Sequence, residues 1–488
     1  MTELQHAAKA TRPRIQPAEE GDRRPLSVSA RLGRLQFHQS GKFRVLQFAD
    51  IQDGPKVSKD TISLIEASLD ATRPDLVIFN GNQIAGYDSA DARTFRKRRW
   101  DARPASASSE ASGERYAAAA LEHTRELVRA TIEQLVHPLA DRGVPWAVTF
   151  GNHDFQCGLD NAEIESICRE FPGCINPERA ADGTTGIAVK HGVKHDVGDM
   201  EQDFGLPEQP VIACAPGTFA LSVTDVDRTY DVLGLVLLDS GDYARSGGYG
   251  SPSEAALRFL ADAPGLMAAQ SQQLQQDRQD EQDSPREPRQ TPSTLPCMVF
   301  QHFPIEQYYR LLKPVAATAA RAIEGYRNFA GRHFVLNEDK TQPGSYLGEG
   351  VSCPDADSGE FAILDKAGYF AISAGHDHRN AFVGSVPVGT DGDRQMMMVA
   401  SPTSGFGSYG PVPAKRAARL FEFDIRHPYE PRTQLLEYDE LVGKPSAGKA
   451  YAYGMTSESK PDSEGMDLLH RPTWWSKTWN KLVSLFRR

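Results

Sequence analysis

Short apolar runs recur along the chain, and each ends at a polar or glycine-containing turn. They restrict the fold more than any other feature, because each is short enough for a strand and most are rich in Val, Ile, Phe or Leu. They span Phe43–Phe48, Leu76–Phe79, Trp146–Phe150, Val232–Leu238, Met298–Phe300, Tyr369–Ser373 and Met396–Ala400. Helical patterns lie between them at Ser58–Ala71 and Tyr116–Leu139, and we expect the second helix to stop near Pro138. Strand, helix and strand in succession predict a layered α/β domain.

The composition is that of a globular protein. The 488 residues are 40% hydrophobic and 24% charged, with a formal net charge of −11. This acidic balance does not favour nonspecific binding to nucleic acid. The sequence has no apolar run long enough to span a membrane, and its N-terminus lacks the apolar core of a secretory signal. We therefore expect a cytoplasmic protein without a specific nucleic-acid partner.

The six cysteines show no paired spacing. They are Cys157, Cys168, Cys174, Cys214, Cys297 and Cys353. Such sparse cysteines favour buried or free thiols in a reducing compartment over a disulfide framework or a zinc site.

Polar and proline-punctuated segments divide the chain. We expect a polar arm at 1–40, a folded domain at 41–440 with insertions near 88–113 and 268–296, and a polar linker at 445–472. The insertion near 268–296 has too few apolar residues to offset the entropy lost on ordering.

The last sixteen residues, 473–488, have the pattern of an amphipathic basic helix. Their three tryptophans, with leucine, valine and phenylalanine, fall on one face, and all their charged residues are basic. This suits a helix lying on an anionic membrane surface. The alternative is that the tryptophans dock on the domain itself, and the sequence favours neither reading.

Oxygen and imidazole side chains follow five of the apolar runs. They are Asp50, Asn82, Asn152, His153, Asp154, His302, His376 and His378. Ligand sites of open α/β sheets form at the carboxyl ends of the strands, so distant segments can converge there. Taken singly, Asp50 is typical of a turn and His302 of a core histidine; together and in this order, the residues indicate a metal site.

The ligand types indicate which metals and which chemistry. Carboxylate, amide and imidazole groups without thiolates suit Mn, Fe or Zn. Two such ions about 3.5–4 Å apart can hold the attacking and leaving oxygens of a phosphoryl displacement. They also lower the pKa of bound water, so that hydroxide exists at neutral pH.

The order of these motifs resembles the calcineurin-like metallophosphoesterase superfamily. The most specific parts are Gly151-Asn152-His153-Asp154 and Gly375-His376-Asp377-His378, and the likeness covers roughly residues 43–425. Three further stretches resemble its purple-acid-phosphatase-related branch: Leu237–Gly241, Gly348–Gly350 and Gly375–Asn380. The tyrosine ligand of true purple acid phosphatases would fall at Ala85, so a purple iron centre is not implied.

The resemblance implies a four-layer αββα sandwich with two mixed β-sheets and two divalent metal ions. It assigns the first metal to Asp50, Gln52 and His378, the second to Asn152, His302 and His376, and the bridging position to Asn82. It also implies that His153 contacts the phosphate and protonates the leaving oxygen, while Asp154 holds the His153 ring.

Two positions depart from the family pattern. Gln52 stands where the family has histidine, and Asp53 beside it is a candidate substitute ligand. Asn82 replaces the bridging aspartate, and a neutral amide offers one oxygen and no negative charge. We expect weak occupancy of one metal, an altered metal preference or low activity.

The leading hypothesis is a metal-dependent phosphoric ester hydrolase that attacks its substrate with a metal-bound hydroxide. The alternative is a degenerate member that binds a phosphate ligand or a partner without turnover, as Gln52 and Asn82 suggest. A nuclease is disfavoured, because no basic strip with interleaved aromatics lines the motif loops.

Overall fold

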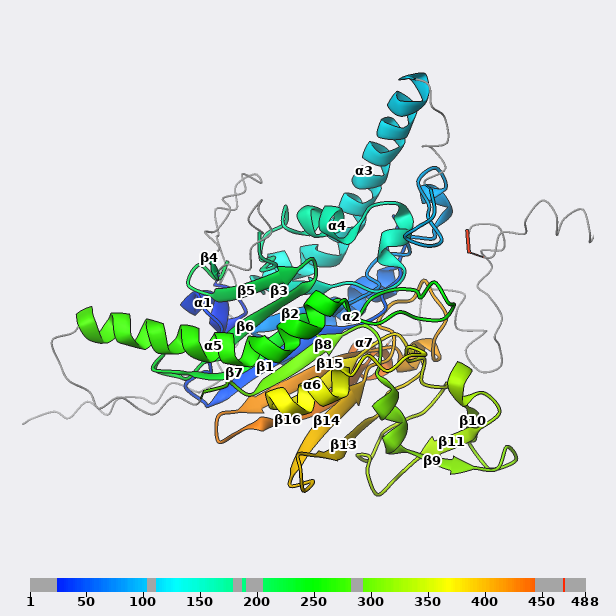
Figure 1. Ribbon diagram of the computed structural model, residues 1–488. Helices are drawn as coiled ribbons and strands as arrows, with labels where there is room; N and C mark the ends of the chain where they lie inside the picture. The colour runs from blue at the N-terminus through cyan, green and yellow to red at the C-terminus, as the bar shows by residue number, and fades with distance from the viewer. Residues whose placement is uncertain are drawn as a thin grey trace, which may run out of the picture.

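The computed structural model describes residues 24–102, 111–178, 187–189, 205–281, 293–443 and 468–469. Two mixed β-sheets, of five and eight strands, pack face to face, with helices on their outer faces (Figure 1). A three-stranded sheet lies at the periphery. The predicted four-layer α/β sandwich with two mixed sheets is confirmed.

Three neighbouring strands of the five-stranded sheet run parallel. They are β1 (Lys42–Phe48), β2 (Leu76–Asn80) and β3 (Trp146–Thr149). β15 (Ala417–Asp424) and β16 (His427–Glu437) extend the sheet as an antiparallel pair beyond β1. Because parallel strands end at the same edge, the segments after β1, β2 and β3 emerge side by side.

The eight-stranded sheet has a parallel centre. It is made of β7 (Asp231–Leu238), β8 (Cys297–Gln301), β12 (Tyr369–Ala374) and β14 (Arg394–Ala400). Antiparallel strands flank this centre: β4 (Ile187–Val189), β5 (Pro210–Ala215) and β6 (Thr218–Thr224) on one side, and β13 (Val383–Val388) on the other. Gln301 pairs with both Leu238 and Ala374, so β7, β8 and β12 end level.

Alternation along the strands assigns each side chain to a layer. Phe43, Val45, Leu76 and Ile78 pack against the other sheet, whereas Leu46, Phe48, Val77 and Phe79 face outward. The outward side chains pack under α2 (Lys59–Thr72), α3 (Ala111–Arg142) and α4 (Asn161–Cys168). On the second sheet, α5 (Glu254–Glu281) and α6 (Glu360–Ala367) cover the outer face.

Shorter elements connect these layers. They are α1 (Val28–Leu32), α7 (Tyr438–Val442), the strands β9 (Leu312–Val315), β10 (Ile323–Glu324) and β11 (His333–Leu336), and the 3-10 turns η1 (Ser89–Asp91), η3 (Asp154–Cys157), η4 (Glu306–Leu311), η5 (Arg327–Phe329) and η6 (Pro413–Lys415). No helix among the residues described here is long and apolar enough to cross a membrane.

The predicted strands and the first predicted helix agree with the structure. All seven apolar runs coincide with strands, although Phe150 lies just beyond β3. Ser58 caps α2, its side chain accepting from the backbone of Asp60 at 3.3 Å. The expected stop near Pro138 is wrong, because α3 continues to Arg142. Burial of Leu139 against the sheet outweighs the hydrogen bond that proline removes.

Two segment boundaries also differ from the sequence analysis. The stretch expected as an insertion near 268–296 begins inside α5, which runs to Glu281. Residues 24–40, assigned to the polar arm, instead form α1 and bury Leu35 and Phe37 completely. The predicted linker at 445–472, apart from residues 468–469, and the predicted helix at 473–488 lie outside the described residues.

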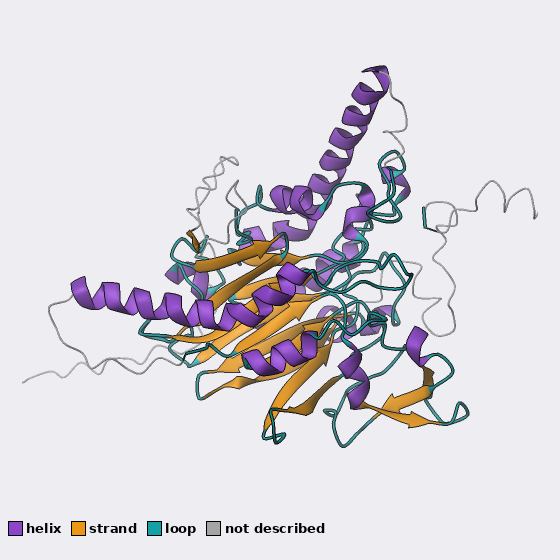
Figure 2. Cartoon of the chain, in the orientation of Figure 1, coloured by secondary structure: helices purple, strands orange, loops and turns teal. Residues whose placement is uncertain are grey.

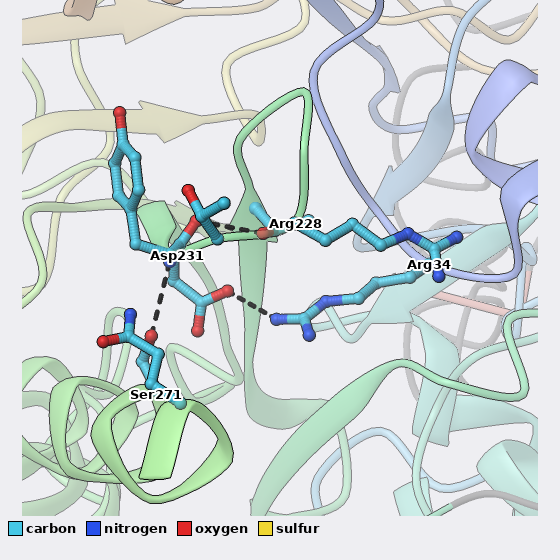
Figure 3. Close-up of a pocket in the computed structure, with 8 residues that line it drawn as sticks. Arg34, Arg228, Asp231 and Ser271 are labelled. Atoms are coloured by element: carbon cyan, nitrogen blue, oxygen red, sulfur yellow. Dashed lines mark hydrogen bonds and ion pairs between the residues drawn. The ribbon is translucent and has the colours of Figure 1, made fainter. Parts of the chain in front are cut away.

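A buried ion pair fastens residues 24–40 to the second sheet. Arg34 pairs with Asp231 at the start of β7, and the Asp231 backbone donates to Oγ of Ser271 in α5 at 3.3 Å. Figure 3 shows Arg34 and Asp231 pointing toward one another beside a small pocket, with Ser271 below. This pocket lies at the end of the sheet opposite to the loops that follow β7 and β8.

Candidate functional site

Five loops meet at the carboxyl ends of the parallel strands. Figure 2 shows loops gathered at one end of both sheets. Asp50 follows β1, Asn82 follows β2, Asn152 follows β3, His302 follows β8 and His376 follows β12. All five side chains are buried, as is that of His378. We call these six residues the site cluster.

Asp50 lies at the centre of the site cluster. Its Oδ1 is 3.4 Å from Nε2 of His378 and 3.8 Å from Nε2 of His302. Its Oδ2 accepts from the backbone N–H of His376 at 2.6 Å. Potential ligand atoms of Asp50, His302 and His376 all lie within 4.8 Å of one another. The spacing therefore allows one ion to contact several of these residues.

Hydrogen bonds fix which nitrogen of two histidines faces Asp50. Nδ1 of His302 lies 3.2 Å from the carbonyl of Asn80, and Nδ1 of His378 lies 2.6 Å from the carbonyl of Tyr409. A carbonyl only accepts, so each Nδ1 carries a hydrogen and each Nε2 is left to face the carboxylate. Two ring nitrogens thus face one carboxylate oxygen, an arrangement that a cation between them would stabilise. The cluster thus fits a metal ion such as Mn, Fe or Zn.

Burial and neighbouring charges set the protonation states of Asp50, His302 and His376. Burial lowers the pKa of His302 and lowers that of His376 further. Burial alone would raise the pKa of Asp50, but His302 and His378 hold it well below its usual range. At neutral pH the Asp50 carboxylate is ionised and the imidazoles of His302 and His376 are neutral, as metal ligation requires.

The backbone is strained where the ligands are presented. Asp50, Asn82 and His376 adopt left-handed φ angles of 51°, 54° and 70°. Such conformations are costly for residues other than glycine and collect at functional sites. A Cβ at Gly151 would lie 2.2 Å from Oδ1 of Asn82, so only glycine permits this close approach. The packing of the loops therefore imposes the ligand geometry.

Asn82 occupies the predicted bridging position as a donor. Its Nδ2 lies 3.1 Å from Oδ1 of Asp50, 3.1 Å from Oδ1 of Asn152 and 2.9 Å from Nε2 of His302. Its Oδ1 accepts from the backbone N–H of His153 at 2.9 Å, which fixes the orientation of the amide. Two hydrogens thus face three acceptors. In this orientation Asn82 offers no oxygen to a metal between those acceptors.

The side chains of Gln52 and Asp53 do not take the metal-ligand positions that the sequence suggested for them. Gln52 is buried, and its backbone N–H donates to the carbonyl of Asn82 at 2.9 Å. Across the described part of the chain, no hydrogen bond joins the Gln52 side chain to the site cluster. Asp53 does not substitute for it, because its Oδ2 accepts from Ser58 at 3.1 Å and from Thr61 at 2.7 Å at the start of α2.

The expected partner of the His153 ring is wrong. Nδ1 of His153 lies 2.7 Å from Oε1 of Gln156. The Asp154 carboxylate instead accepts backbone N–H groups of Gly151 and Asn82, both at 2.8 Å, and of Ile84 at 3.2 Å. Asp154 therefore holds the loops after β2 and β3 together and does not orient the imidazole. Burial lowers the pKa of His153 to about 4.

Sequence reasoning missed two tyrosines that support the cluster. The hydroxyl of Tyr243 lies 2.8 Å from Nδ2 of Asn152, and the ring of Tyr409 stacks on His378 at 4.1 Å. Tyr243 stands two residues after Leu237–Gly241, which was recognised only as a family-like stretch.

A C-terminal segment also reaches the site. The backbone N–H of Leu468 donates to the carbonyl of Tyr87 at 2.9 Å. The Tyr87 ring packs edge-on against His153, with centroids 4.9 Å apart.

Comparison with known proteins supports the family resemblance, although no family model matches the sequence. Probable inactive purple acid phosphatase 28 of Arabidopsis thaliana is 24% identical over 411 residues, covering 80% of this chain and 77% of that protein. Probable inactive purple acid phosphatase 29 of the same plant is 20% identical, covering 94% and 92%. Phosphatase DCR2 of Saccharomyces cerevisiae is 22% identical, covering 74% of this chain but 47% of the yeast protein.

At 20–24% identity, the chain is similar to purple-acid-phosphatase-like proteins of the calcineurin-like metallophosphoesterase superfamily. Similar solved structures include PhoD, with 9% identity, a TM-score of 0.38 and coverage of 82% of this chain and 69% of that chain. GAP50 of Plasmodium, described as an anchor in the inner membrane complex, has 9% identity, a TM-score of 0.37 and coverage of 82% and 86%.

Proposed function

We propose that this metallophosphoesterase-like chain is a metal-dependent phosphoric ester hydrolase. The supporting observation is that Nε2 of His302 and Nε2 of His378 both face the ionised carboxylate of Asp50. With Asn152 and His376 beside them, these groups form a buried set of oxygen and nitrogen ligands for a divalent ion. A bound metal supplies Lewis acidity and lowers the pKa of coordinated water.

His153 is the proposed phosphate-binding group. Its Nδ1 is engaged by Gln156, and its Nε2 lies 3.3 Å from Nδ2 of Asn152, on the side of the site cluster. Burial keeps the imidazole neutral in the free protein. An anionic phosphate beside Nε2 raises the pKa of His153, and the protonated ring can then donate to the leaving oxygen.

A degenerate, ligand-binding protein is the second candidate. Asn82 places an N–H donor where the family resemblance expects a bridging carboxylate. Without that negative charge, holding two dications close together costs more. Two of the relatives named above are called probable inactive phosphatases. A single metal and slow turnover, or binding without turnover, would follow.

Metal analysis with a hydrolysis panel tests the proposal. Full-length protein is loaded with Mn, Fe or Zn, the ions per chain are counted, and phosphomonoesters and phosphodiesters are offered as substrates. We expect at least one ion per chain and hydrolysis that is lost in Asp50→Asn. Bound metal without hydrolysis of any ester would contradict the hydrolase and support the degenerate protein.

Asn82→Asp separates the two candidates. Activity that appears only in this variant supports degeneracy, whereas substantial activity in both proteins excludes it. Asn82→Ala is the matched control, since it removes the amide without restoring a carboxylate.

Cytoplasmic location and membrane contact through residues 473–488 are also proposals. Flotation with anionic liposomes, comparing the full chain with one that ends at residue 472, tests the membrane contact. Equal flotation of both proteins would contradict it.

A further inference from the structure

We propose that residues 93–101 form a basic wall beside the site cluster that selects phosphate esters carrying a second anionic group. The inference rests on the proposed function for the identity of the first phosphate site. The segment reads Arg-Thr-Phe-Arg-Lys-Arg-Arg-Trp-Asp, with five basic residues among nine in a chain of net charge −11. We call it the arginine loop.

Backbone hydrogen bonds attach the arginine loop to the residue that orients His153. The backbone N–H of Arg96 donates to the carbonyl of Gln156 at 3.0 Å, and Nε2 of Gln156 donates to the carbonyl of Lys97 at 3.0 Å. The same Gln156 accepts at Oε1 from Nδ1 of His153, at 2.7 Å. One glutamine side chain thus bridges the loop and the proposed phosphate-binding imidazole.

A second connection runs through Tyr243. The Arg98 guanidinium lies over the Tyr243 ring, 3.7 Å from its centroid. The hydroxyl of that tyrosine is 2.8 Å from Nδ2 of Asn152 in the site cluster. Arg98 is therefore separated from the cluster by one tyrosine side chain. Arg245 extends the positive surface, with its guanidinium 5.0 Å from the ring centre of Trp100.

The charges of this wall are only partly neutralised. Arg99 forms an ion pair with Asp242. Within the parts of the chain that are described, Lys97, Arg98 and Arg245 form no ion pair with a carboxylate. Lys97 and Arg245 are exposed and Arg98 is half-buried. A cationic surface next to His153, the half-buried histidine proposed to bind phosphate, suits an anion that extends out of the site.

A small ester with two phosphates fits this arrangement better than a nucleic acid. The cations without a carboxylate partner lie on two short segments, Lys97 and Arg98 in the arginine loop and Arg245 beside Trp100, whereas single-stranded nucleic acid needs a longer basic groove with stacking aromatics. Two of the rings beside these cations are covered within the protein, Tyr243 by Arg98 and Phe155 by Arg99, which leaves Trp100 as the exposed ring of the loop.

Calorimetric titration with matched esters tests the proposal. Metal-free, full-length protein is titrated with fructose 1,6-bisphosphate and with fructose 6-phosphate, which differ by one phosphate. We expect the bisphosphate to bind about tenfold more tightly, as one charge-assisted contact provides. In Lys97→Gln/Arg98→Gln the two affinities should become equal within about twofold.

A control variant removes the same net charge elsewhere. Lys59→Gln/Lys366→Gln takes away two exposed cations outside the arginine loop, one at the start of α2 and the other near the end of α6. It should keep the preference for the bisphosphate. Lys97→Gln alone, at an exposed position, gives a second test should the double variant unfold. A preference that survives both loop variants, or no binding of either ester by the wild type, overturns the proposal.

The outcomes separate this proposal from the proposed function. A metal-loaded protein that hydrolyses no ester while the bisphosphate preference depends on Lys97 and Arg98 contradicts the hydrolase and supports the wall. Hydrolysis by the metal-loaded protein, together with a bisphosphate preference that survives in the loop variants, supports the hydrolase and contradicts the wall. Tighter binding of a thymidine oligonucleotide than of the bisphosphate overturns the assignment to a small ester.

Discussion

Nδ2 of Asn82 lies 2.9 Å from Nε2 of His302, at the centre of the site cluster. Nδ1 of His302 donates to the carbonyl of Asn80. Nε2 of His302 therefore accepts a hydrogen bond from the side-chain amide of Asn82. The amide hydrogen therefore stands where a metal–imidazole bond would form. Metal binding must displace this contact, so the residue at position 82 controls the affinity of the site for cations.

Asn82→Asp should make stability depend on metal. In the metal-free variant a second carboxylate would stand about 3 Å from Asp50, and two such buried groups cannot both ionise without cost. We expect the melting temperature to fall when metal is removed and to rise by several degrees on saturation with metal. Scanning calorimetry with and without a chelator measures this shift. Asn82→Ala should show a small metal-induced shift, and an equally large one would contradict the role assigned to the carboxylate.

Tyr243→Phe should weaken metal binding without unfolding the protein. The hydroxyl holds Nδ2 of Asn152 and thereby turns Oδ1 of Asn152 toward Nε2 of His302, at 3.0 Å. Loss of such a supporting hydrogen bond typically costs 10–100-fold in metal affinity. Calorimetric titration with Mn or Zn measures the change. Tyr249→Phe is the matched control. Tyr249 contacts His376 through its ring, with ring centroids 4.4 Å apart, and phenylalanine keeps that ring.

The sequence predicted the strands and ligand loops well because both signals are local. Alternation along Phe43–Phe48 assigns each side chain to a face, and Asp50 follows directly at the strand end. The stop at Pro138 was wrong because burial of Leu139, a tertiary effect, outweighs the hydrogen bond that proline removes, and α3 continues to Arg142. The assignment of residues 24–40 failed similarly, since the partner of Arg34 lies at Asp231, nearly two hundred positions away.

Side-chain partners within the site were less predictable. The sequence Asn-His-Asp places Asp154 next to His153. The Asp154 carboxylate nevertheless accepts hydrogen bonds from three backbone N–H groups instead of the imidazole. Gln156 takes the imidazole because the 3-10 turn η3 brings position 156 back toward position 153. Such choices depend on loop conformation, which no residue spacing in this chain reveals.

Glu360→Gln should change how stability depends on pH. Burial raises the pKa of Glu360 to about 7, above its ordinary value of 4.5, and Gln301 is its hydrogen-bond partner. The folded state therefore binds this proton more tightly than the unfolded state. The resulting stability is fully present below pH 4.5 and is lost as pH rises through 7, by about 3 kcal/mol in all.

Urea denaturation at pH 5 and pH 8 measures this effect. The glutamine mimics the protonated acid, so the variant should gain stability relative to wild type at pH 8 and little at pH 5. Glu254→Gln, at the exposed start of α5, is the control and should show no such difference. An identical pH dependence in wild type and Glu360→Gln would show that Glu360 does not titrate in this range.

Arg34→Met should destabilise the fold more than a change in the site cluster does. The variant leaves Asp231 buried without its cation, and breaking one side of a buried pair typically costs about 3–5 kcal/mol. Burial already raises the pKa of Asp231 against the effect of Arg34, so the lone carboxyl would take up a proton and the loss would shrink at low pH. In Arg34→Met/Asp231→Leu both charges are absent, and stability should return to near that of wild type. Urea denaturation of the two variants and Asp231→Leu completes a double-mutant cycle. Additive losses in that cycle would mean that the ion pair does not fasten residues 24–40 to the second sheet.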